Sequence, residues 1–309
     1  MKKILITGGA GFIASCLAER MVRNPEHFVV IVDNLLTGSP EKLPDAKYKN
    51  WRFIKGDVND YNTIASIMLS HSFDYVFHYA AVVGVQRTLA NPVMVLNDII
   101  GIRNVLELCK NTGVQRAYFS SSSEVYGEPV EFPQNEQTTP LNSRLPYAIV
   151  KNVGESYFKS YQQEFGLDYT IFRFFNTYGP KQSSDFVISK FIRAALNNDA
   201  ITIYGDGSQT RTFCYIEDHL DATVRTFMEN QHVNDIINIG NDIEIPIIEV
   251  AQLVIELTKS KSKLIHLPKL KEGDMTRRQP DISKMKNLLS RQPISLREGI
   301  EKILKSGLF

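Results

Sequence analysis

The chain has 309 residues, of which 43% are hydrophobic and 22% are charged. This length suggests one large domain or two closely associated ones, and the apolar content can supply a sizeable core. The 35 basic and 34 acidic residues leave a formal net charge of +1, which excludes a strong bulk attraction to nucleic acid or to an anionic membrane. We therefore expect neither as a partner, and any anion-binding site must be local.

The N-terminal segment and the cysteines favour a cytoplasmic protein. Lys2 and Lys3 run directly into an apolar segment and a glycine turn, so we expect no signal peptide. Apolar runs stay below the roughly 18 residues of a membrane-spanning helix. Cys16, Cys109 and Cys214 lack a metal-type spacing. We expect them to be buried, reduced thiols, and we expect no bound metal.

The first half of the chain alternates short apolar segments with helical ones. Strands are predicted over 4–6, 28–32, 52–54, 75–78, 117–120 and 169–173, and helices over 16–22, 93–110 and 150–164. This alternation indicates βαβ units with right-handed crossovers and a parallel sheet. The strands are apolar without strict alternation, as expected when both faces of a sheet are covered.

Past Asn176 the pattern loosens and turns become frequent. A helix over 186–198 and a strand over 201–204 are predicted, and segment 236–240 is expected to rejoin the first sheet. From residue 247 the pattern reads as helix, strand, a charged loop over 271–281 and helix. We therefore predict an α/β protein with a Rossmann-type, doubly wound parallel sheet in a nucleotide-binding domain (1–176). A smaller, mainly substrate-binding C-terminal α/β lobe follows (177–309).

A glycine-rich turn follows the first predicted strand and opens a helix (residues 7–14). Side chains at Gly8 and Gly11 would block a pyrophosphate, which the helix N-terminus attracts through its free N–H groups. Asp33 ends the second strand about 20 residues on, where a carboxylate binds ribose hydroxyls and repels a 2′-phosphate. The pattern favours NAD over NADP; an ordinary turn with a capping Asp is the alternative. The predicted cofactor-binding residues here are Gly8, Gly11, Phe12, Ile13, Asp33 and Asn34.

The end of the third strand offers a further cofactor position. Asp57 and Val58 follow Gly56 directly after that strand. A carboxylate at this place suits a hydrogen bond to the adenine amino group. Taken alone, Asp57 fits a helix cap equally well.

Tyr147 and Lys151 form a Tyr-x-x-x-Lys pair on one face of a predicted helix. A tyrosine with the ordinary pKa of about 10 is a poor base at pH 7. A neighbouring ammonium group and the positive nicotinamide ring favour the phenolate. Tyr147 would then take a proton from a sugar hydroxyl while hydride leaves the same carbon, although such a pair also occurs by chance in helices.

Four serines, Ser120 to Ser123, follow the fifth predicted strand and precede Glu124. A hydroxyl there can share the hydrogen bond to the reacting oxygen. The alternative is an ordinary polar loop. The functional interpretation gains weight because the serines begin at the carboxyl end of a strand, where ligands bind in such sheets.

These motifs together resemble the extended short-chain dehydrogenases/reductases of the NAD-dependent epimerase/dehydratase family, from Thr7 to about Asp281. The resemblance also rests on segments 78–81, 122–127, 173–180 and 205–211. It implies an NAD-dependent enzyme in which Ser122 is the catalytic hydroxyl, Tyr147 the base and Lys151 the group that lowers its pKa.

The resemblance also implies contacts with cofactor and substrate. Ala80 and Ala81 would line the dinucleotide path, and Tyr147 and Lys151 would also contact the cofactor. Asn176 and Arg211 would contact the diphosphate of a nucleotide sugar, because a guanidinium binds phosphate oxygens through paired hydrogen bonds. Arg277, with Arg278 beside it, lies in a second stretch of this kind. The predicted substrate-binding residues are Ser122, Ser123, Tyr147, Asn176, Arg211 and Arg277.

Members of the family begin alike, with hydride removal from C4 by NAD, and differ in the following step. Ser123 stands where dehydratases of the dTDP-glucose type carry Asp, beside the candidate acid–base residue Glu124. The GDP-mannose type has a similar stretch but is expected to use NADP, which Asp33 disfavours. Segments 81–86 and 147–151 resemble epimerases, whereas 122–127, 205–211 and the arginine-rich loop also resemble UDP-glucuronate decarboxylases.

The resemblance therefore implies an NAD-dependent 4-epimerase of a nucleotide sugar, with a UDP-hexose favoured. A UDP-glucuronate decarboxylase is the alternative, and a 4,6-dehydratase is less favoured. A sensor or scaffold that binds NAD without turnover is the non-enzyme alternative. The family also leads us to expect a homodimer formed through the helices at 93–110 and 150–164.

Overall fold

The computed structural model describes every residue except 129, 269–276 and 308–309. The chain forms two compact units. Unit 1 comprises residues 1–127, 141–174 and 223–237, and unit 2 comprises residues 128–140, 175–222 and 238–309. The sequence predicts one domain boundary, after residue 176, and the structure has a boundary two residues earlier, after residue 174. Two segments depart from the predicted division: residues 128–140 belong to unit 2, and residues 223–237 belong to unit 1.

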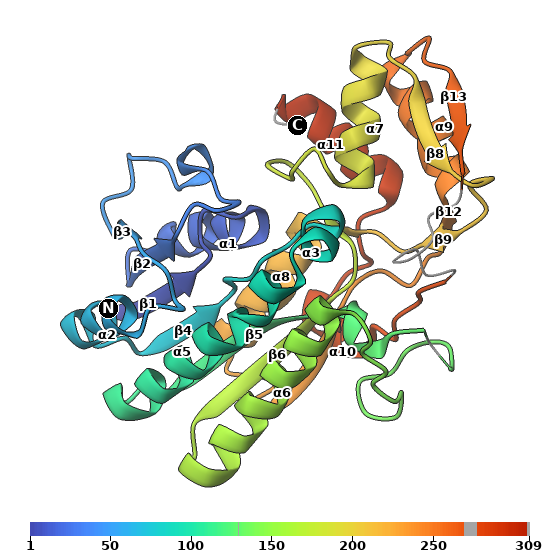
Figure 1. Cartoon of the computed structure of the whole chain (residues 1–309). Coiled ribbons are helices and arrows are strands. Elements are labelled where there is room, and N and C mark those ends of the chain that lie inside the picture. Colours follow the sequence, from blue (N-terminus) through green and yellow to red (C-terminus); the bar gives the residue numbers. More distant parts are fainter. Residues whose placement is uncertain (129, 269–276, 308–309) are drawn as a thin grey trace. The chain divides into compact units, whose positions relative to one another are not determined.

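Unit 1 is built on a seven-stranded sheet (Figure 1). The strands are β1 (Lys2–Thr7), β2 (His27–Asp33), β3 (Trp51–Lys55), β4 (Tyr75–His78), β5 (Arg116–Ser122), β6 (Asp168–Phe174) and β11 (Asp235–Ile239). Their order is β11-β6-β5-β4-β1-β2-β3, and the pairs from β3 through β6 are parallel. The order reverses between β1 and β4, which places the ligand-binding switch point of a doubly wound sheet at their carboxyl ends. The Rossmann-type prediction is confirmed.

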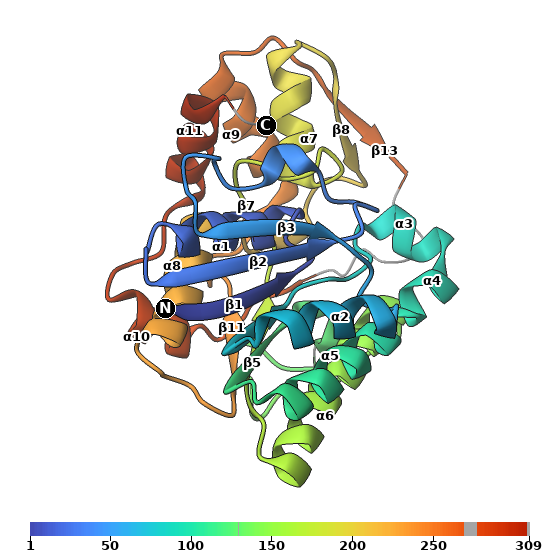
Figure 2. The ribbon, with the colours of Figure 1, turned by 90° about the vertical axis from the view of Figure 1, so that its left-hand side faces the viewer.

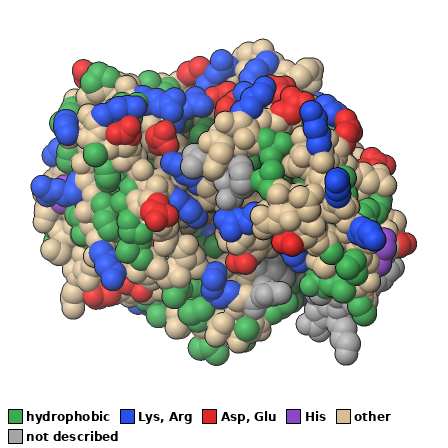
Figure 3. Space-filling model, turned by 90° about the horizontal axis from the view of Figure 1, so that it is seen from above, with side chains coloured by type: hydrophobic (Ala, Val, Ile, Leu, Met, Phe, Trp, Pro, Cys, Tyr) green, Lys and Arg blue, Asp and Glu red, His purple; other side chains and the backbone are tan. Residues whose placement is uncertain are grey.

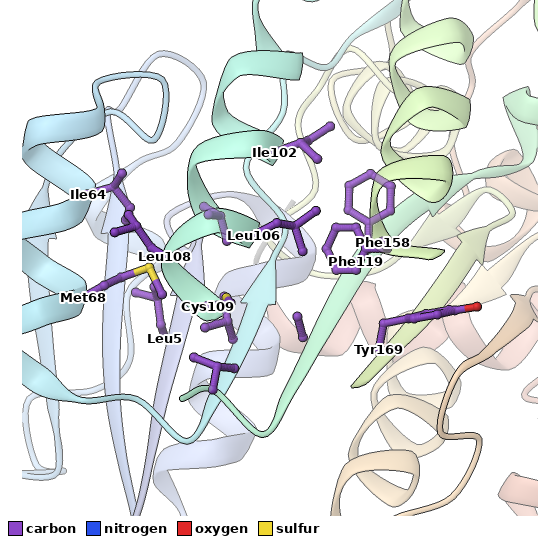
Figure 4. Packing of buried hydrophobic residues seen from close by; sticks show 14 of the residues in the cluster. Leu5, Ile64, Met68, Ile102, Leu106, Leu108, Cys109, Phe119, Phe158 and Tyr169 are labelled. Atoms are coloured by element: carbon purple, nitrogen blue, oxygen red, sulfur yellow. The ribbon is translucent and has the colours of Figure 1, made fainter. Parts of the chain in front are cut away.

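Helices cover both faces of this sheet. They are α1 (Phe12–Val22), α2 (Tyr61–His71), α3 (Val85–Ala90), α4 (Pro92–Leu96), α5 (Asp98–Thr112), α6 (Pro146–Phe165) and the part of α8 (Ile216–Met228) from residue 223, with 3-10 turns η1 (Pro40–Lys42) and η2 (Ser123–Tyr126). Figure 2 shows α2, α5 and α6 together on one face. Alternate strand residues such as Val76 and Phe119 join the core under these helices. Figure 4 shows Phe119 beside Phe158 of α6. Their neighbours Phe77 and Tyr118 point the other way and contact Phe227 of α8.

The expected helix over 93–110 is two helices in the structure. α4 ends at Leu96 and α5 begins at Asp98. Between them, the Ile100 N–H donates to the Asn97 carbonyl at 2.9 Å, a bond that spans three residues rather than four. A tight turn of this kind interrupts the regular bonding of an α-helix. It leaves Asp98 in the first turn of α5, at the carboxyl end of the sheet.

In its described residues, unit 2 combines four helices and the first part of α8 with three two-stranded sheets. The helices are α7 (Val187–Leu196), α9 (Ile247–Thr258), α10 (Ser283–Leu289) and α11 (Leu296–Ser306). The strand pairs are β7 (Thr177–Tyr178) with β10 (Cys214–Tyr215), β8 (Ile201–Tyr204) with β13 (Leu264–Leu267), and β9 (Thr210–Arg211) with β12 (Ile245–Pro246). The expected strand over 201–204 is present. Most of the expected charged loop, residues 271–276, lies outside the described residues.

The distribution of charged side chains on the surface agrees with the balanced charge of the chain. On the face drawn in Figure 3, Lys and Arg side chains are interspersed with Asp and Glu side chains. Within the part of the chain that the structure describes, every helix is too short or too polar to cross a membrane.

Candidate active site

The turn between β1 and α1 packs against the segment that follows β4. Gly8 has a φ of +69°, and a Cβ on it would lie 2.7 Å from the backbone N and Cα of Ala80. The Gly8 N–H donates to the Val32 carbonyl at 2.7 Å, and the Gly11 N–H donates to the Gly8 carbonyl at 3.0 Å. Only glycine fits this conformation and this contact. The turn thus brings together two sequence-predicted cofactor residues, Gly8 and Ala80, and leads into the N-terminus of α1, where Phe12 and Ile13 form the first turn.

Asp33 lies at the end of β2 with its carboxylate held in one orientation. Its Oδ2 accepts the Ala10 N–H at 3.0 Å and its Oδ1 accepts the Leu35 N–H at 2.7 Å. A Cβ on Gly38 would lie 2.9 Å from both carboxylate oxygens. The side chain is buried. A carboxylate has about four lone-pair sites, so each oxygen keeps acceptor capacity for the ribose hydroxyls of a dinucleotide.

Asp57 and Asn34 contact each other across the ends of β2 and β3. The Asn34 Nδ2 donates to Asp57 Oδ2 at 3.1 Å, and the Asn59 N–H donates to Asp57 Oδ1 at 2.9 Å. The N-cap of α2 is Asp60. Asp57 is therefore not the cap of that helix, and its carboxylate lies at the same edge of the sheet as Asp33.

Thr7 and His78 form a buried polar contact between the two strands at the switch point. Thr7 Oγ1 lies 2.9 Å from His78 Nδ1 and accepts the N–H groups of Tyr79 and Ala80 at 3.2 Å. Burial, reinforced by the charge of Lys151, lowers the pKa of His78 to about 3. His78 is thus neutral at physiological pH, and the contact fixes the backbone just before the predicted Ala80–Ala81 path. The sequence prediction did not select Thr7 or His78 individually, although both lie in motifs that support the family resemblance.

Helix α6 carries the predicted acid–base pair. The Lys151 Nζ lies 5.7 Å from the ring centroid of Tyr147 and 4.9 Å from that of Phe119. It also donates to the Ser120 carbonyl at 2.6 Å. Burial lowers the pKa of Lys151 to about 8, against the opposing charge of Asp98. The helix therefore brings Tyr147 and Lys151 together and anchors the ammonium at the end of β5.

The predicted serine and glutamate positions occupy the turn after β5. Ser122 Oγ accepts the Glu124 N–H at 3.2 Å as the cap of η2. Because a hydroxyl has both a donor and acceptor sites, the Ser122 O–H can still be donated to a reacting oxygen. Ser122 and Ser123 are both buried, whereas Glu124 is partly exposed. Of these three side chains, that of Glu124 is therefore the most accessible to a ligand.

A buried ion pair connects α6 to the strands that carry these residues. Glu155 and Arg173, with side chains 1% and 2% exposed, form two short contacts: Arg173 Nε to Oε1 at 2.9 Å and Nη2 to Oε2 at 2.7 Å. Ser121 Oγ donates to Glu155 at 2.6 Å, and Arg173 Nη1 donates to the Tyr126 hydroxyl at 2.7 Å. Ser121 lies between Ser120 and the predicted catalytic hydroxyl, so this network fixes α6 against the end of β5. The sequence prediction did not include it.

In unit 2, the predicted residues Asn176 and Arg211 lie near the same backbone segment. Asn176 has a φ of +41° and donates from Nδ2 to the Thr212 carbonyl at 3.0 Å, while its own carbonyl accepts the Cys214 N–H at 3.2 Å. Arg211 lies in β9 opposite Ile245 of β12. Both side chains are partly exposed.

Arg277 is held by a carboxylate of its own unit. Its Nε and Nη2 each lie 2.8 Å from an oxygen of Glu244, and its guanidinium lies 4.2 Å from the ring centroid of Phe132. Glu244 also accepts the Thr210 hydroxyl at 2.9 Å. Arg277 is 45% exposed, whereas Arg278 is 6% exposed. A phosphate that binds Arg277 would therefore have to compete with Glu244.

The glycine turn, the oriented carboxylate and the switch point fit a bound dinucleotide. The glycine turn packs tightly against Ala80 and leads into the N-terminus of α1, which attracts a pyrophosphate, and Asp33 presents acceptors at the adjacent strand end. Tyr147 and Lys151 supply a phenol with a neighbouring ammonium group. Fold and site together are those of a Rossmann-type, dinucleotide-binding protein.

Comparison with known proteins identifies the family. Residues 4–240 match the model described as the NAD dependent epimerase/dehydratase family, and the chain belongs to this family. It is an enzyme that uses NAD, in agreement with the sequence prediction.

Individual relatives cover nearly the whole chain. The chain is 37% identical to the UDP-N-acetyl-alpha-D-glucosaminuronate decarboxylase of Bacillus cytotoxicus, over 98% of this chain and 97% of that protein. It is 36% identical to the UDP-glucuronic acid decarboxylase 1 of Danio rerio, over 98% of this chain and 72% of that protein. Among solved structures, the UDP-glucose 4-epimerase of Thermotoga maritima matches with a TM-score of 0.91 and 31% identity, over 98% of this chain and 97% of that chain.

Proposed function

We propose that this chain removes the carboxyl group of a UDP-linked uronic acid sugar after oxidation at C4. The observation that supports this proposal is the likeness, at 36–37% identity and over 98% of this chain, to two decarboxylases named for such substrates. The 4-epimerase expected from the sequence stays as the second candidate, and the similarity to the Thermotoga maritima epimerase favours it. Both reactions begin with the same oxidation, so Ser122, Tyr147 and Lys151 would serve either outcome.

In the first step, Tyr147 takes the proton of the C4 hydroxyl and Ser122 donates a hydrogen bond to that oxygen. Lys151 stabilises the phenolate through its charge. Bound NAD, for which Gly8 and Asp33 would supply the site, would provide the acceptor for the C4 hydride and the source of its return. The 4-keto uronate is a β-keto acid: its C5–C6 bond breaks, carbon dioxide leaves, and the electron pair moves to the C4 oxygen as an enolate.

The second half needs a proton at C5. Glu124 follows the capping serine and is partly exposed, and we assign it the exchange of a proton with C5. Protonation restores the ketone, after which returned hydride and the Tyr147 proton rebuild the C4 hydroxyl. The sum is one uronate and one proton converted to one pentose and one carbon dioxide. Epimerisation needs no proton at C5, so Glu124 distinguishes the two candidates.

For the diphosphate we propose Asn176, Arg211 and Arg277. A guanidinium binds phosphate oxygens in pairs. In the structure, Glu244 and the Phe132 ring hold Arg277. Arg277 can therefore bind the diphosphate only if a phosphate replaces the Glu244 carboxylate as its partner.

A panel of substrates tests the reaction. With UDP-glucuronate or UDP-N-acetylglucosaminuronate we expect carbon dioxide and a UDP-pentose, measured by NMR, and Glu124→Gln should abolish this product. A C4 epimer formed from UDP-glucose or UDP-N-acetylglucosamine without carbon dioxide would instead establish the epimerase, and Glu124→Gln would then retain activity. A 4-keto-6-deoxy product would indicate a dehydratase. Protein that binds NAD and reduces none of it with any member of the panel would indicate a sensor or scaffold.

We further propose that two copies associate through the outer surface of α4, α5 and α6. Val93 and Ile100 are exposed apolar residues on the first two helices. On the outer side of α6, a groove of about 540 Å³ is lined in part by Ile149, Val153 and Tyr157. An apolar surface of this kind on a helical face is suited to burial against an identical face.

Ile100→Glu should therefore abolish self-association, because it would bury an unpaired carboxylate in the proposed interface. In sedimentation equilibrium the unaltered protein should have twice the mass of one 35.1 kDa chain, and the variant the mass of one. Ile265→Glu, which replaces an exposed isoleucine of β13 in unit 2, is the matched control and should stay dimeric. A monomeric unaltered protein would refute the proposal.

A further inference from the structure

Residues 122–127 form the turn after β5 and carry two groups of the proposed mechanism, Ser122 and Glu124. Ser122 Oγ accepts the Glu124 N–H at 3.2 Å, and the Gly127 N–H closes the turn by donating to the Glu124 carbonyl at 3.0 Å. These bonds lie within the turn and shape it. They do not fix it relative to α6 or β6, so its placement depends on contacts with those elements.

One end of this turn is held by Glu155 of α6. Glu155 lies four residues after Lys151, on the same face of the helix, and the two side chains bind consecutive residues of β5. Lys151 Nζ donates to the Ser120 carbonyl at 2.6 Å. Ser121 Oγ donates to Glu155 Oε1 at 2.6 Å. Because Ser122 is the next residue, α6 fixes the backbone directly before the turn.

The other end is held by Arg173 of β6. Its Nη1 donates to the Tyr126 hydroxyl at 2.7 Å, and its guanidinium lies 4.7 Å from the centroid of the Tyr126 ring. The same guanidinium binds Glu155 through Nε at 2.9 Å and Nη2 at 2.7 Å. Tyr126 is fully buried, as are the other two side chains. One guanidinium therefore connects both ends of the turn through charge-assisted hydrogen bonds, which are stronger than neutral ones.

We propose that Arg173 is a positioning residue: through Glu155 at one end and Tyr126 at the other, it sets the place of the turn after β5. The proposal rests on the roles assigned above to Ser122 and Glu124. Both act on the sugar over hydrogen-bond distances of about 2.6–3.2 Å, so a small displacement of the turn takes them out of reach. The Tyr126 hydroxyl holds the turn without joining α6 to the sheet, and its removal therefore separates positioning from overall stability.

Tyr126→Phe tests the proposal, because it removes this hydroxyl and keeps the buried ring and the Arg173–Glu155 pair. Amide hydrogen exchange followed by NMR needs no substrate and reports local opening. Exchange at the Gly127 N–H should become about tenfold faster relative to the Phe119 N–H, the change expected for the loss of one hydrogen bond to a charged group. Phe119, in the buried strand β5, is the reference because it reports any loss of overall stability. An unchanged ratio of the two rates would overturn the proposal.

Kinetics separate positioning from a purely structural role. With an active substrate, Tyr126→Phe should lower kcat about 10-fold at a temperature where the variant is folded, less than the roughly 10²-fold cost of a 1 Å displacement. KM and the content of bound NAD should stay within about twofold of the unaltered values, because the hydroxyl binds Arg173, outside the residues assigned to the diphosphate and the cofactor. A kcat equal to that of the unaltered protein would refute the role in the reaction.

Tyr118→Phe is the matched control. It removes the hydroxyl of another buried tyrosine, whose ring lies 4.9 Å from the Arg116 guanidinium near the amino end of β5, and it should change neither the exchange ratio nor kcat. If Tyr126→Phe does not fold, Ser121→Ala decides: it removes the contact of Glu155 with the other end of the turn, and it should likewise speed exchange in the turn and lower kcat. No effect of Ser121→Ala on exchange would contradict the proposal. If no substrate is turned over, the proposed function fails, while the exchange ratios still decide whether this network holds the turn.

Discussion

Tyr147→Phe is expected to lower kcat about 10³-fold, the middle of the range for loss of a general acid–base group. The variant keeps the ring that lies 5.7 Å from the Lys151 ammonium and removes only the hydroxyl that exchanges a proton with the C4 oxygen. The glycine turn and Asp33 are untouched, so the content of bound NAD should be that of the unaltered protein. Steady-state kinetics, with absorbance to quantify the nucleotide, measures both quantities.

The matched control for this variant is Tyr157→Phe. Tyr157 lies on the same helix, ten residues further on, and lines the outer groove of α6. The loss of the Tyr157 hydroxyl should leave kcat nearly unchanged. Comparable turnover in Tyr147→Phe and the unaltered protein would show that another group acts as the base.

Glu155→Ala is expected to lower the free energy of unfolding by about 3–5 kcal/mol, because removal of one partner leaves an uncompensated buried charge. Arg173 would keep its guanidinium within the protein interior, where its side chain is 2% exposed, and Ser121 would lose its acceptor. Chemical denaturation followed by circular dichroism gives the value. Replacement of both partners by apolar residues, as in Glu155→Leu with Arg173→Met, should recover much of the loss.

An exposed ion pair provides the comparison. Glu256 and Arg297 lie 2.9 Å apart with side chains 62% and 50% exposed. Exposed pairs contribute little to stability because water and salt screen them, so Glu256→Ala should leave the unfolding transition nearly unchanged. Equal effects of Glu155→Ala and Glu256→Ala would contradict the role of the buried network.

Local sequence patterns were sufficient to predict the features that depend on residues close together along the chain. The apolar segment before Gly8 and the acid at the end of the next strand predicted β1, the glycine turn and the place of Asp33. The spacing of Tyr147 and Lys151 was enough to put both on one helical face. By contrast, the break at Asn97 depends on a turn that interrupts an otherwise helical pattern, and periodicity alone did not reveal it.

The remaining features of the site come from residues far apart in the sequence. Glu155 meets Arg173 and Ser121 only after α6 packs on β5 and β6. A charged residue inside an apolar strand, such as Arg173 in β6, was the available signal of a buried partner. The sequence did not identify that partner, because many acidic residues were candidates.

The contact between Gly8 and Ala80 shows that Gly8 has a structural role in addition to its role at the nucleotide site. The space that a side chain would need at Gly8 is filled by the protein's own backbone, in the segment that follows β4. The protein backbone therefore requires glycine at this position even without a bound nucleotide, in addition to any requirement of the nucleotide itself. A loss of cofactor affinity in a Gly8 variant could come from a changed contact with the nucleotide or from disturbed packing against Ala80. The stability of the nucleotide-free variant must be known before the position is interpreted as a contact to NAD.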